Sequence, residues 1–125
     1  MSKKILVADD EPDVLFMTAF SLRTVGGFEV IEARNGLEAL EKAQQSPPDL
    51  IILDIKMPRL NGYEACRRLR EIPALKDIPI IFLSAKGQRT EVEEGLSLGA
   101  ADYILKPFAP EDLVGKVREI LGKKR

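Results

Sequence analysis

The sequence predicts an α/β fold in which five parallel strands alternate with five helices. Five short apolar runs recur at even spacing along the 125 residues, and helix start and stop signals lie between them. Two of these runs, residues 50–53 and 80–83, are continuously apolar, as in strands that are buried on both faces. Strands that alternate with helices in this way form a parallel sheet that is covered by helices on both sides.

The expected strands are residues 5–8, 28–33, 50–54, 78–84 and 103–106. Of the strand orders that suit a chain this short, we choose the five-stranded order 2-1-3-4-5, which gives a flavodoxin-like three-layer sandwich. The Pro47-Pro48 pair is typical of a turn before the third strand. We find no linker and no internal repeat, and therefore expect a single domain over residues 1–125.

Each gap between the expected strands carries signals for a helix. Pro12 is typical of a first helical residue, and a pair of glycines ends the same segment. Asn35 and Thr90 each precede a Glu by three residues, as in a capping box. The third helix should run from about residue 62 to 71, and Pro110 should open the last one.

Composition narrows the possible chemistry. The chain has 19 Lys and Arg, 20 Asp and Glu, one Cys and no His, which gives a formal net charge of −1. Without His, no internal imidazole can act as a general base or a zinc ligand, and one Cys cannot form an intrachain disulfide. The charge balance argues against direct binding of nucleic acid. Because we find neither a signal peptide nor a membrane segment, we expect a cytoplasmic protein.

The carboxylates converge on one edge of the predicted sheet. Asp9 and Asp10 come directly after the first strand, and Asp54 ends the third. These strands are neighbours in the expected order, and ligands of such sheets bind beyond the carboxyl ends of the strands. Ser84 and Lys106 end two further strands on the same rim. Taken singly, Asp9, Asp10 and Glu11 could complement the positive end of the first helix and Asp54 could cap a turn, but the joint placement of these polar residues favours a binding site.

Three clustered carboxylates need neutralisation, because neighbouring negative charges disfavour one another's ionisation. Mg²⁺ takes oxygen ligands and uses one or two carboxylates together with waters and phosphate oxygens. Lys106 adds a fixed positive charge, and Ser84 adds a hydroxyl donor. A carboxylate nucleophile, a divalent cation, an ammonium group and a hydroxyl together suit an incoming phosphoryl group.

A set of short motifs runs through nearly the whole chain. They are ILVADDEP at residues 5–12, LDIKMP at 53–58, NG at 61–62, LSA at 83–85 and GAADYILKPF at 99–108. In this order they resemble the receiver domain of two-component response regulators, over residues 3–121. The resemblance implies a stand-alone receiver of the chemotaxis type, which uses phosphorylation to switch its contacts with other proteins.

The resemblance implies roles for individual residues. Asp54 would accept the phosphoryl group, and Lys106 and Ser84 would contact its oxygens. Ser84, Tyr103 and Pro107 would form the switch, in which the aromatic ring changes rotamer as the Ser84 loop moves. The Lys106-Pro107 bond is expected to be cis. The contacts that change would lie on the face formed by the fourth helix, the fifth strand and the fifth helix.

The cofactor and the partners are implied in the same way. Asp10 and Asp54 would bind Mg²⁺, or Mn²⁺, directly. Asp9 would act mainly through a metal-bound water, and Lys56 through its backbone carbonyl. A sensor histidine kinase or histidine phosphotransferase would donate the phosphoryl group, and a downstream protein would read the signal. The chain would be a monomer or a weak phosphorylation-dependent dimer. It would catalyse only its own phosphorylation and dephosphorylation.

The first predicted helix is apolar on more than one side. One of its stripes consists of Leu15, Phe16, Ala19 and Phe20. A second stripe consists of Val14, Met17, Leu22 and Val25, with the small residues Thr18 and Ser21. A helix between sheet and water buries only one such stripe fully, so we expect the first to be exposed. By family precedent this stripe would dock the partner kinase or phosphotransferase, and the alternatives are a broad core face or a dimer contact.

Other functions fit parts of the sequence. Haloacid-dehalogenase-like phosphohydrolases also use an Asp nucleophile with Mg²⁺, but they place a second Asp where this chain has Lys56. A flavin carrier shares the topology, yet the acidic loop after the first strand would repel a phosphate. A scaffold receiver that is never phosphorylated is disfavoured, because all five site residues are present. Lys56, and Lys86 two residues beyond Ser84, either modulate the lifetime of the phosphoryl group or are plain surface lysines.

Overall fold

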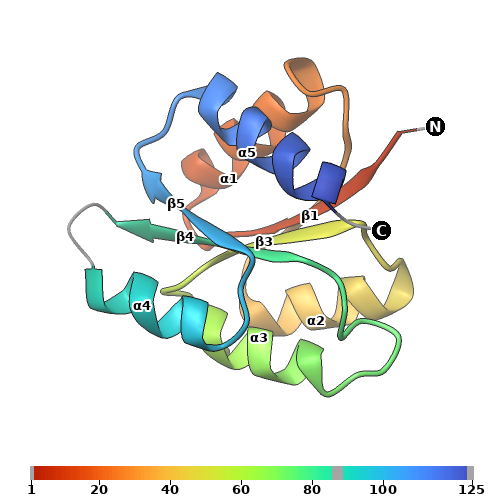
Figure 1. Cartoon of the computed structure of the whole chain (residues 1–125), viewed down its shortest axis with the longest axis vertical. Helices are drawn as coiled ribbons and strands as arrows, with labels where there is room; N and C mark the ends of the chain where they lie inside the picture. The colour runs from red at the N-terminus through yellow and green to blue at the C-terminus, as the bar shows by residue number, and fades with distance from the viewer. Residues whose placement is uncertain (1, 86–88, 124–125) are drawn as a thin grey trace.

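The computed structural model describes residues 2–85 and 89–123, so the prediction for Lys86 lies outside the described residues. Along these residues five strands and five helices alternate (Figure 1). The elements are β1 (Lys4–Ala8), α1 (Pro12–Thr24), β2 (Glu29–Ala33), α2 (Gly36–Gln45), β3 (Leu50–Asp54), α3 (Gly62–Arg70), β4 (Ile80–Ala85), α4 (Arg89–Ser97), β5 (Asp102–Lys106) and α5 (Pro110–Lys123). None of the described helices is both long and apolar enough to cross a membrane.

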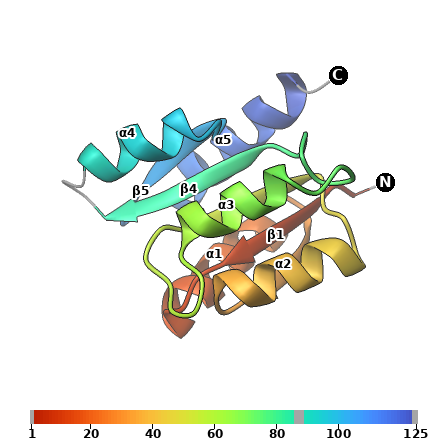
Figure 2. The same cartoon turned by 90° about the horizontal axis from the view of Figure 1, so that it is seen from below.

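The strands form one sheet in the order β2-β1-β3-β4-β5, and all its pairs are parallel. Helices α1 and α5 cover one face, while α2, α3 and α4 cover the other (Figures 1 and 2). This confirms the flavodoxin-like three-layer sandwich and its strand order. Strands β1 and β3 are neighbours at the point where the order of the strands across the sheet reverses, so their carboxyl ends flank the crevice that such sheets use for ligands.

Successive residues of the central strands supply two separate cores. In β1, Ile5 and Val7 pack in the core under α1 and α5, whereas Leu6 and Ala8 pack in the core under α2 and α3. Side chains alternate between the faces of a strand, so a sheet with helices on both sides requires apolar residues at every position. The continuous apolar runs of the sequence therefore reflect a sheet that is buried on both faces.

The buried side of α1 differs from the expected one. Leu15 and Ala19 are 6% and 1% exposed, whereas Phe16 and Phe20 are 62% and 51% exposed. The prediction that all four share one exposed stripe was therefore wrong for Leu15 and Ala19. These two lie with Leu22 on a single face with helical spacing, and Leu15 and Leu22 pack in the core under α1 and α5. Met17, which was expected on the buried stripe, is 53% exposed. The residues left exposed beside this face are Phe16, Met17 and Phe20.

Two helices begin with the same five-residue pattern. The sequence Asn-Gly-x-Glu-Ala occurs at 35–39 and again at 61–65, a short repeat in a chain where no internal repeat was expected. Asn35 Oδ1 accepts a hydrogen bond from the Glu38 amide at 2.8 Å, and Asn61 Oδ1 accepts one from the Glu64 amide at 2.9 Å. The Glu64 side chain accepts the Asn61 N–H at 3.1 Å, which completes a capping box at α3, whereas the Glu38 side chain accepts the N–H of Arg34, one residue before the cap of α2, at 3.0 Å. Both helix starts are thereby satisfied locally.

The other predicted helix starts have mixed outcomes. Pro12 is the first residue of α1, as expected, and Glu11 before it makes no capping hydrogen bond with its side chain. Helix α4 begins at Arg89, so Thr90 lies inside the helix and the expected cap at this residue was wrong. The side chain of Thr90 is outside the described part of the chain.

Two helical glycines are expected to respond in opposite ways to an added methyl group. A Cβ at Gly95 would lie 2.7 Å from the Phe82 ring, whereas a Cβ at Gly115 would meet nothing within 4 Å. Gly95→Ala should therefore lower the free energy of unfolding by about 1–3 kcal/mol through overpacking. Gly115→Ala should raise it by about 0.5–1 kcal/mol through reduced backbone entropy. Urea denaturation of both variants checks this, and equal shifts would contradict the packing of α4 on Phe82.

Candidate functional site

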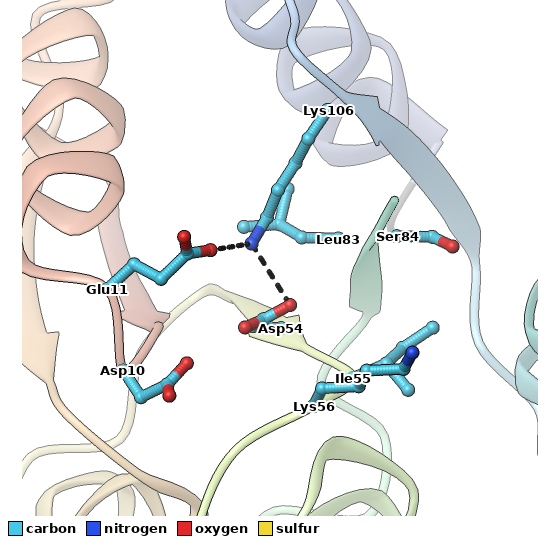
Figure 3. A pocket seen from close by; sticks show the side chains of 8 residues that line it. All are labelled: Asp10, Glu11, Asp54, Ile55, Lys56, Leu83, Ser84 and Lys106. Atoms are coloured by element: carbon cyan, nitrogen blue, oxygen red, sulfur yellow. Dashed lines mark hydrogen bonds and ion pairs between the residues drawn. The ribbon is translucent and has the colours of Figure 1, made fainter. Parts of the chain in front are cut away.

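The carboxyl ends of the central strands open into a cleft of about 290 Å³ (Figure 3). The cleft contains five of the residues that the sequence singled out, which are Asp10, Asp54, Lys56, Ser84 and Lys106. Asp9 lies beneath them and is fully buried. The strand order explains this convergence, because each of these residues lies within two residues of the carboxyl end of a strand.

The Lys106 ammonium group lies at the centre of the charges in this cleft. Its Nζ is 3.1 Å from Asp9 Oδ2, 3.1 Å from Glu11 Oε1 and 3.2 Å from Asp54 Oδ1. Figure 3 shows the side chain descending from β5 with its tip between Glu11 and Asp54. Burial disfavours the charge on Lys106, but the facing Asp54 and Asp9 outweigh it and raise its pKa to about 12. The residue therefore carries a fixed positive charge at neutral pH.

One ammonium group does not balance the acidic residues around it. Asp9, Glu11 and Asp54 each place a carboxylate oxygen within 4.8 Å of the other two. Burial, and after it the charge of Asp9, raises the pKa of Asp54 to about 7, although Lys106 acts in the opposite direction. In the protein alone, the buried Asp54 is therefore hard to ionise fully at neutral pH. The cluster needs further positive charge to hold all three groups ionised.

The buried Asp9 carboxylate identifies where such a charge fits. Its Oδ1 accepts a hydrogen bond from the Glu11 amide at 3.0 Å. Its Oδ2 is buried and has no partner in hydrogen-bond geometry within the described residues, although the Lys106 ammonium lies nearby as an ion pair. Oxygen donors of this kind, with waters and phosphate oxygens, are the ligands that Mg²⁺ prefers. The acidic pocket thus suits Mg²⁺ or the similar Mn²⁺.

The carboxylates that cluster are not quite the expected ones. Glu11 was interpreted only as a complement to the positive end of the first helix, yet it contacts Lys106 and belongs to the cluster. Asp10 lines the cleft, but its exposed side chain lies outside this cluster of carboxylates. The signal that could have identified Glu11 is its place directly before Pro12, on the same loop as the two predicted ligands.

The predicted switch residues lie beside the cleft. Ser84 is 1% exposed and pairs in register with Leu105 of β5. Tyr103 of the same strand is half-buried, with the Lys116 ammonium group of α5 5.7 Å from the centre of its ring. The Lys106-Pro107 peptide bond is cis, which confirms the expectation for this bond.

Residues 5–118 match the family model of the response regulator receiver domain, and the chain belongs to this family. It is 43% identical, over 98% of its length, to the alkaline phosphatase synthesis transcriptional regulatory protein PhoP of Bacillus subtilis. Its fold superposes on the chemotaxis protein CheY4 of Vibrio cholerae with a TM-score of 0.89 and 33% identity, covering 96% of this chain and 99% of the other.

A further solved relative bears directly on the metal. The receiver domain of the sensor histidine kinase PA1611 from Pseudomonas aeruginosa, with a magnesium ion coordinated in its active site cleft, is 29% identical with a TM-score of 0.90. The similarity covers 98% of this chain and 100% of that one.

The family assignment sets the general function. The chain is a phosphoacceptor module of two-component signalling, and receiver domains pair with histidine kinases. The assignment replaces the haloacid-dehalogenase-like alternative. The chain spans about half the length of the curated relatives it matches, since it covers 50% of the PhoP protein.

The raised pKa of Asp54 predicts how the stability of the metal-free protein depends on pH. The pKa is about 7 in the folded protein against an ordinary value of 3.8, so the folded state retains a proton that the unfolded chain loses. The free energy of unfolding should therefore fall as the pH rises from about 4 through about 7, and stay low above that. Urea denaturation across this range measures it.

Two controls separate Asp54 from the other titrating groups. Asp54→Asn should flatten this part of the pH profile, because the amide does not ionise. Adding Mg²⁺ to the wild-type protein should offset the loss above neutral pH, because the cation favours the ionised carboxylate. If the Asn variant keeps the full slope, another group is responsible.

Proposed function

We propose that this protein accepts a phosphoryl group on Asp54 from the phosphohistidine of a sensor histidine kinase or histidine phosphotransferase. The phosphorylated form would then change its contacts with a downstream protein. The observation that carries the proposal is the position of the Lys106 ammonium group, 3.2 Å from Asp54 Oδ1 in a cleft that also suits Mg²⁺. An ionised carboxylate beside a fixed cation, open to a ligand, suits in-line phosphoryl transfer.

The proposed transfer breaks one bond and forms one. An Asp54 oxygen attacks the phosphorus opposite the imidazole nitrogen of the partner. The P–N bond breaks, its electron pair stays on the imidazole, and an acyl phosphate forms on Asp54. When bound, Mg²⁺ neutralises charge on the transferring oxygens. The residues that would hold it are Asp10 and Asp54, the backbone carbonyl of Lys56, and Asp9 through a water molecule.

Lys106 and Ser84 would stabilise the product. The Lys106 ammonium group now faces three carboxylates, and the phosphoryl oxygens would replace Glu11 or Asp9 as its partners. Ser84 is the last residue but one of β4 and lines the same cleft, and Figure 3 shows its hydroxyl pointing away from Asp54, so it would turn toward the site to donate to a phosphoryl oxygen. Lys106 is already beside Asp54, and charge that is balanced by a prepositioned cation costs little reorganisation during transfer.

Phosphorylation would alter the protein surface through contacts of β5. Ser84 pairs in register with Leu105 of β5. Tyr103, two residues before Leu105, is partly buried and packs against the core under α2 and α3. Lys116 of α5 lies over the ring of Tyr103 and forms an ion pair with Asp102 at 3.2 Å. Movement of Ser84 toward a phosphoryl group would thus disturb contacts between β5 and α5. We propose that phosphorylation shifts the population between two conformations of the face formed by α4, β5 and α5. Pro107, which directly follows β5, would take part in this change.

The partner that donates the phosphoryl group would dock on α1. Phe16, Met17 and Phe20, here called the α1 surface, are more than half exposed. Beside them an apolar groove of about 470 Å³ extends from Met17 to the cis-proline loop. Glu11 and Lys106 line both this groove and the acidic cleft. A partner helix that covers the α1 surface and the groove would bring its phosphohistidine to the mouth of the cleft.

Phosphorylation at Asp54 is tested by the mass of the protein after incubation with a small acyl phosphate and Mg²⁺. The wild-type chain should gain the mass of one phosphoryl group, because Asp54 is the carboxylate beside Lys106. Asp54→Asn should gain none, whereas Asp77→Asn, at an exposed site away from the cleft, should behave like the wild type. Equal gain in the Asp54 variant would refute the assignment, and no gain in the wild type would favour a phosphorylation-independent scaffold.

Docking on α1 is tested by phosphotransfer from the phosphorylated cognate partner. Phe16→Ala with Phe20→Ala should slow this transfer at least tenfold, because truncated aromatic anchors typically cost more than 1 kcal/mol at an interface. Phosphorylation by the small acyl phosphate should be unchanged. Leu37→Ala, at an exposed apolar residue of α2, is the matched control. An unchanged rate of transfer from the partner in the double variant would exclude this docking site.

A further inference from the structure

The repeated Asn-Gly-x-Glu-Ala pattern meets the loop that follows the phosphoacceptor strand. This loop connects β3 to α3 and is here called the β3–α3 loop, residues 55–61. The second copy of the pattern ends the loop and begins α3. The first copy begins α2, and the amide of its Gly36 donates a hydrogen bond to the Leu60 carbonyl at 3.1 Å. Each copy therefore places a glycine, as the first residue of a helix, against this loop.

Gly36 packs on the loop so closely that no side chain fits. A Cβ at this position would overlap the Leu60 carbonyl oxygen and lie 2.8 Å from the carbonyl carbon of the same residue. Asn35 accepts the Glu38 amide as the cap of α2, and the Glu38 side chain accepts the Arg34 amide, so the backbone on both sides of Gly36 is held and α2 cannot easily retreat. The Leu60 side chain is itself 6% exposed and belongs to the core. An added methyl group would therefore displace the loop rather than a flexible side chain.

Gly62 makes the corresponding contact at the start of the loop. A Cβ here would overlap the backbone carbonyl oxygen of Asp54 and lie 2.9 Å from the Ile55 Cα. The amide of Gly62 donates a hydrogen bond to the Ile55 carbonyl at 2.9 Å, which closes the loop on itself. One glycine thus holds the loop where it leaves Asp54, and the other holds it near Leu60.

Between these two contacts the backbone takes an unfavourable path. Arg59 has a φ of 68°, the single positive φ among the described non-glycine residues. The Leu60 amide donates to the Pro58 carbonyl at 2.7 Å, so the chain turns back on itself within three residues. A side chain in this left-handed region is disfavoured, and such a conformation persists only where its surroundings impose it. The hydrogen bonds and close contacts of Gly36 and Gly62 are what impose it here.

We propose that Gly36 is a positioning residue for the metal and phosphoryl site, acting through the β3–α3 loop. This inference rests on the proposed function, in which the backbone carbonyl of Lys56 is a ligand of Mg²⁺. Lys56 is the second residue of this loop, between the contact of Gly62 with Asp54 and Ile55 and the contact of Gly36 with Leu60, so the direction of its carbonyl depends on the path that both contacts set. Gly36 restrains the loop from a separate element, α2, which itself contributes no metal ligand.

The test compares the metal affinity of variants that lose stability for different reasons. Gly36→Ala pushes on the Leu60 carbonyl, whereas Ala43→Gly weakens the same helix at a buried position that is remote from the loop in sequence. Mn²⁺ binding is followed by the electron paramagnetic resonance of free Mn²⁺, and Mg²⁺ binding by competition. We expect both variants to lower the thermal midpoint of the metal-free protein. Only Gly36→Ala should weaken metal binding, by about tenfold or more, which is the usual effect of removing support from a metal ligand.

A milder variant keeps the test decisive if Gly36→Ala does not fold. Asn35→Ala removes the cap that fixes Gly36 without adding a clash, and should weaken metal binding in the same direction by a smaller factor. Wild-type affinity in folded Gly36→Ala, or an equal loss in Ala43→Gly, would overturn the proposal while leaving the proposed function intact. Failure of the wild-type protein to bind either metal would overturn both.

Discussion

The balance of charge around Lys106 is the constraint on which the rest of the structure depends. One ammonium group contacts carboxylates from Asp9, Glu11 and Asp54 at 3.1–3.2 Å, in a place where Asp9 is fully buried. Because burial and Asp9 both oppose ionisation of Asp54, removing Lys106 would leave the acidic cluster without its internal counterion. The same imbalance gives the site its capacity for chemistry, since added positive charge and a phosphoryl group can each change the partners of Lys106.

The fold makes this arrangement possible by assigning each charge to a different element. Asp9 follows β1, Asp54 ends β3 and Lys106 ends β5, and parallel strands bring these ends to one edge of the sheet. The two apolar cores beneath hold the strands in register, while the β3–α3 loop is held by Gly36 and Gly62. Because the packed cores hold the strands and the close glycine contacts hold the loop, the side chains at the carboxyl ends of the strands are the groups that can change partners when a ligand binds.

The differences between expectation and structure have identifiable causes. Leu15 and Ala19 were assigned to an exposed stripe because apolar residues occupy several sides of α1, and composition alone does not show which side meets the sheet. Glu11 was missed because an acidic residue before a helix has an ordinary explanation in the helix dipole. Its contact with Lys106 spans 95 positions of the sequence, and no local pattern encodes a contact at that separation.

The sequence by itself determined the fold class and the positions of Asp10, Asp54, Ser84 and Lys106 at or near the carboxyl ends of strands, whereas the strand order was chosen among those that suit the chain and was confirmed by the structure. The sequence could do so because hydrophobic periodicity and helix capping are local signals, and because the ends of parallel strands share an edge. The tertiary structure alone decided which carboxylates share Lys106, which side of α1 faces solvent, and that Gly36 touches the loop after Asp54. These features depend on distances between elements that are far apart in the chain, and packing of both cores sets those distances.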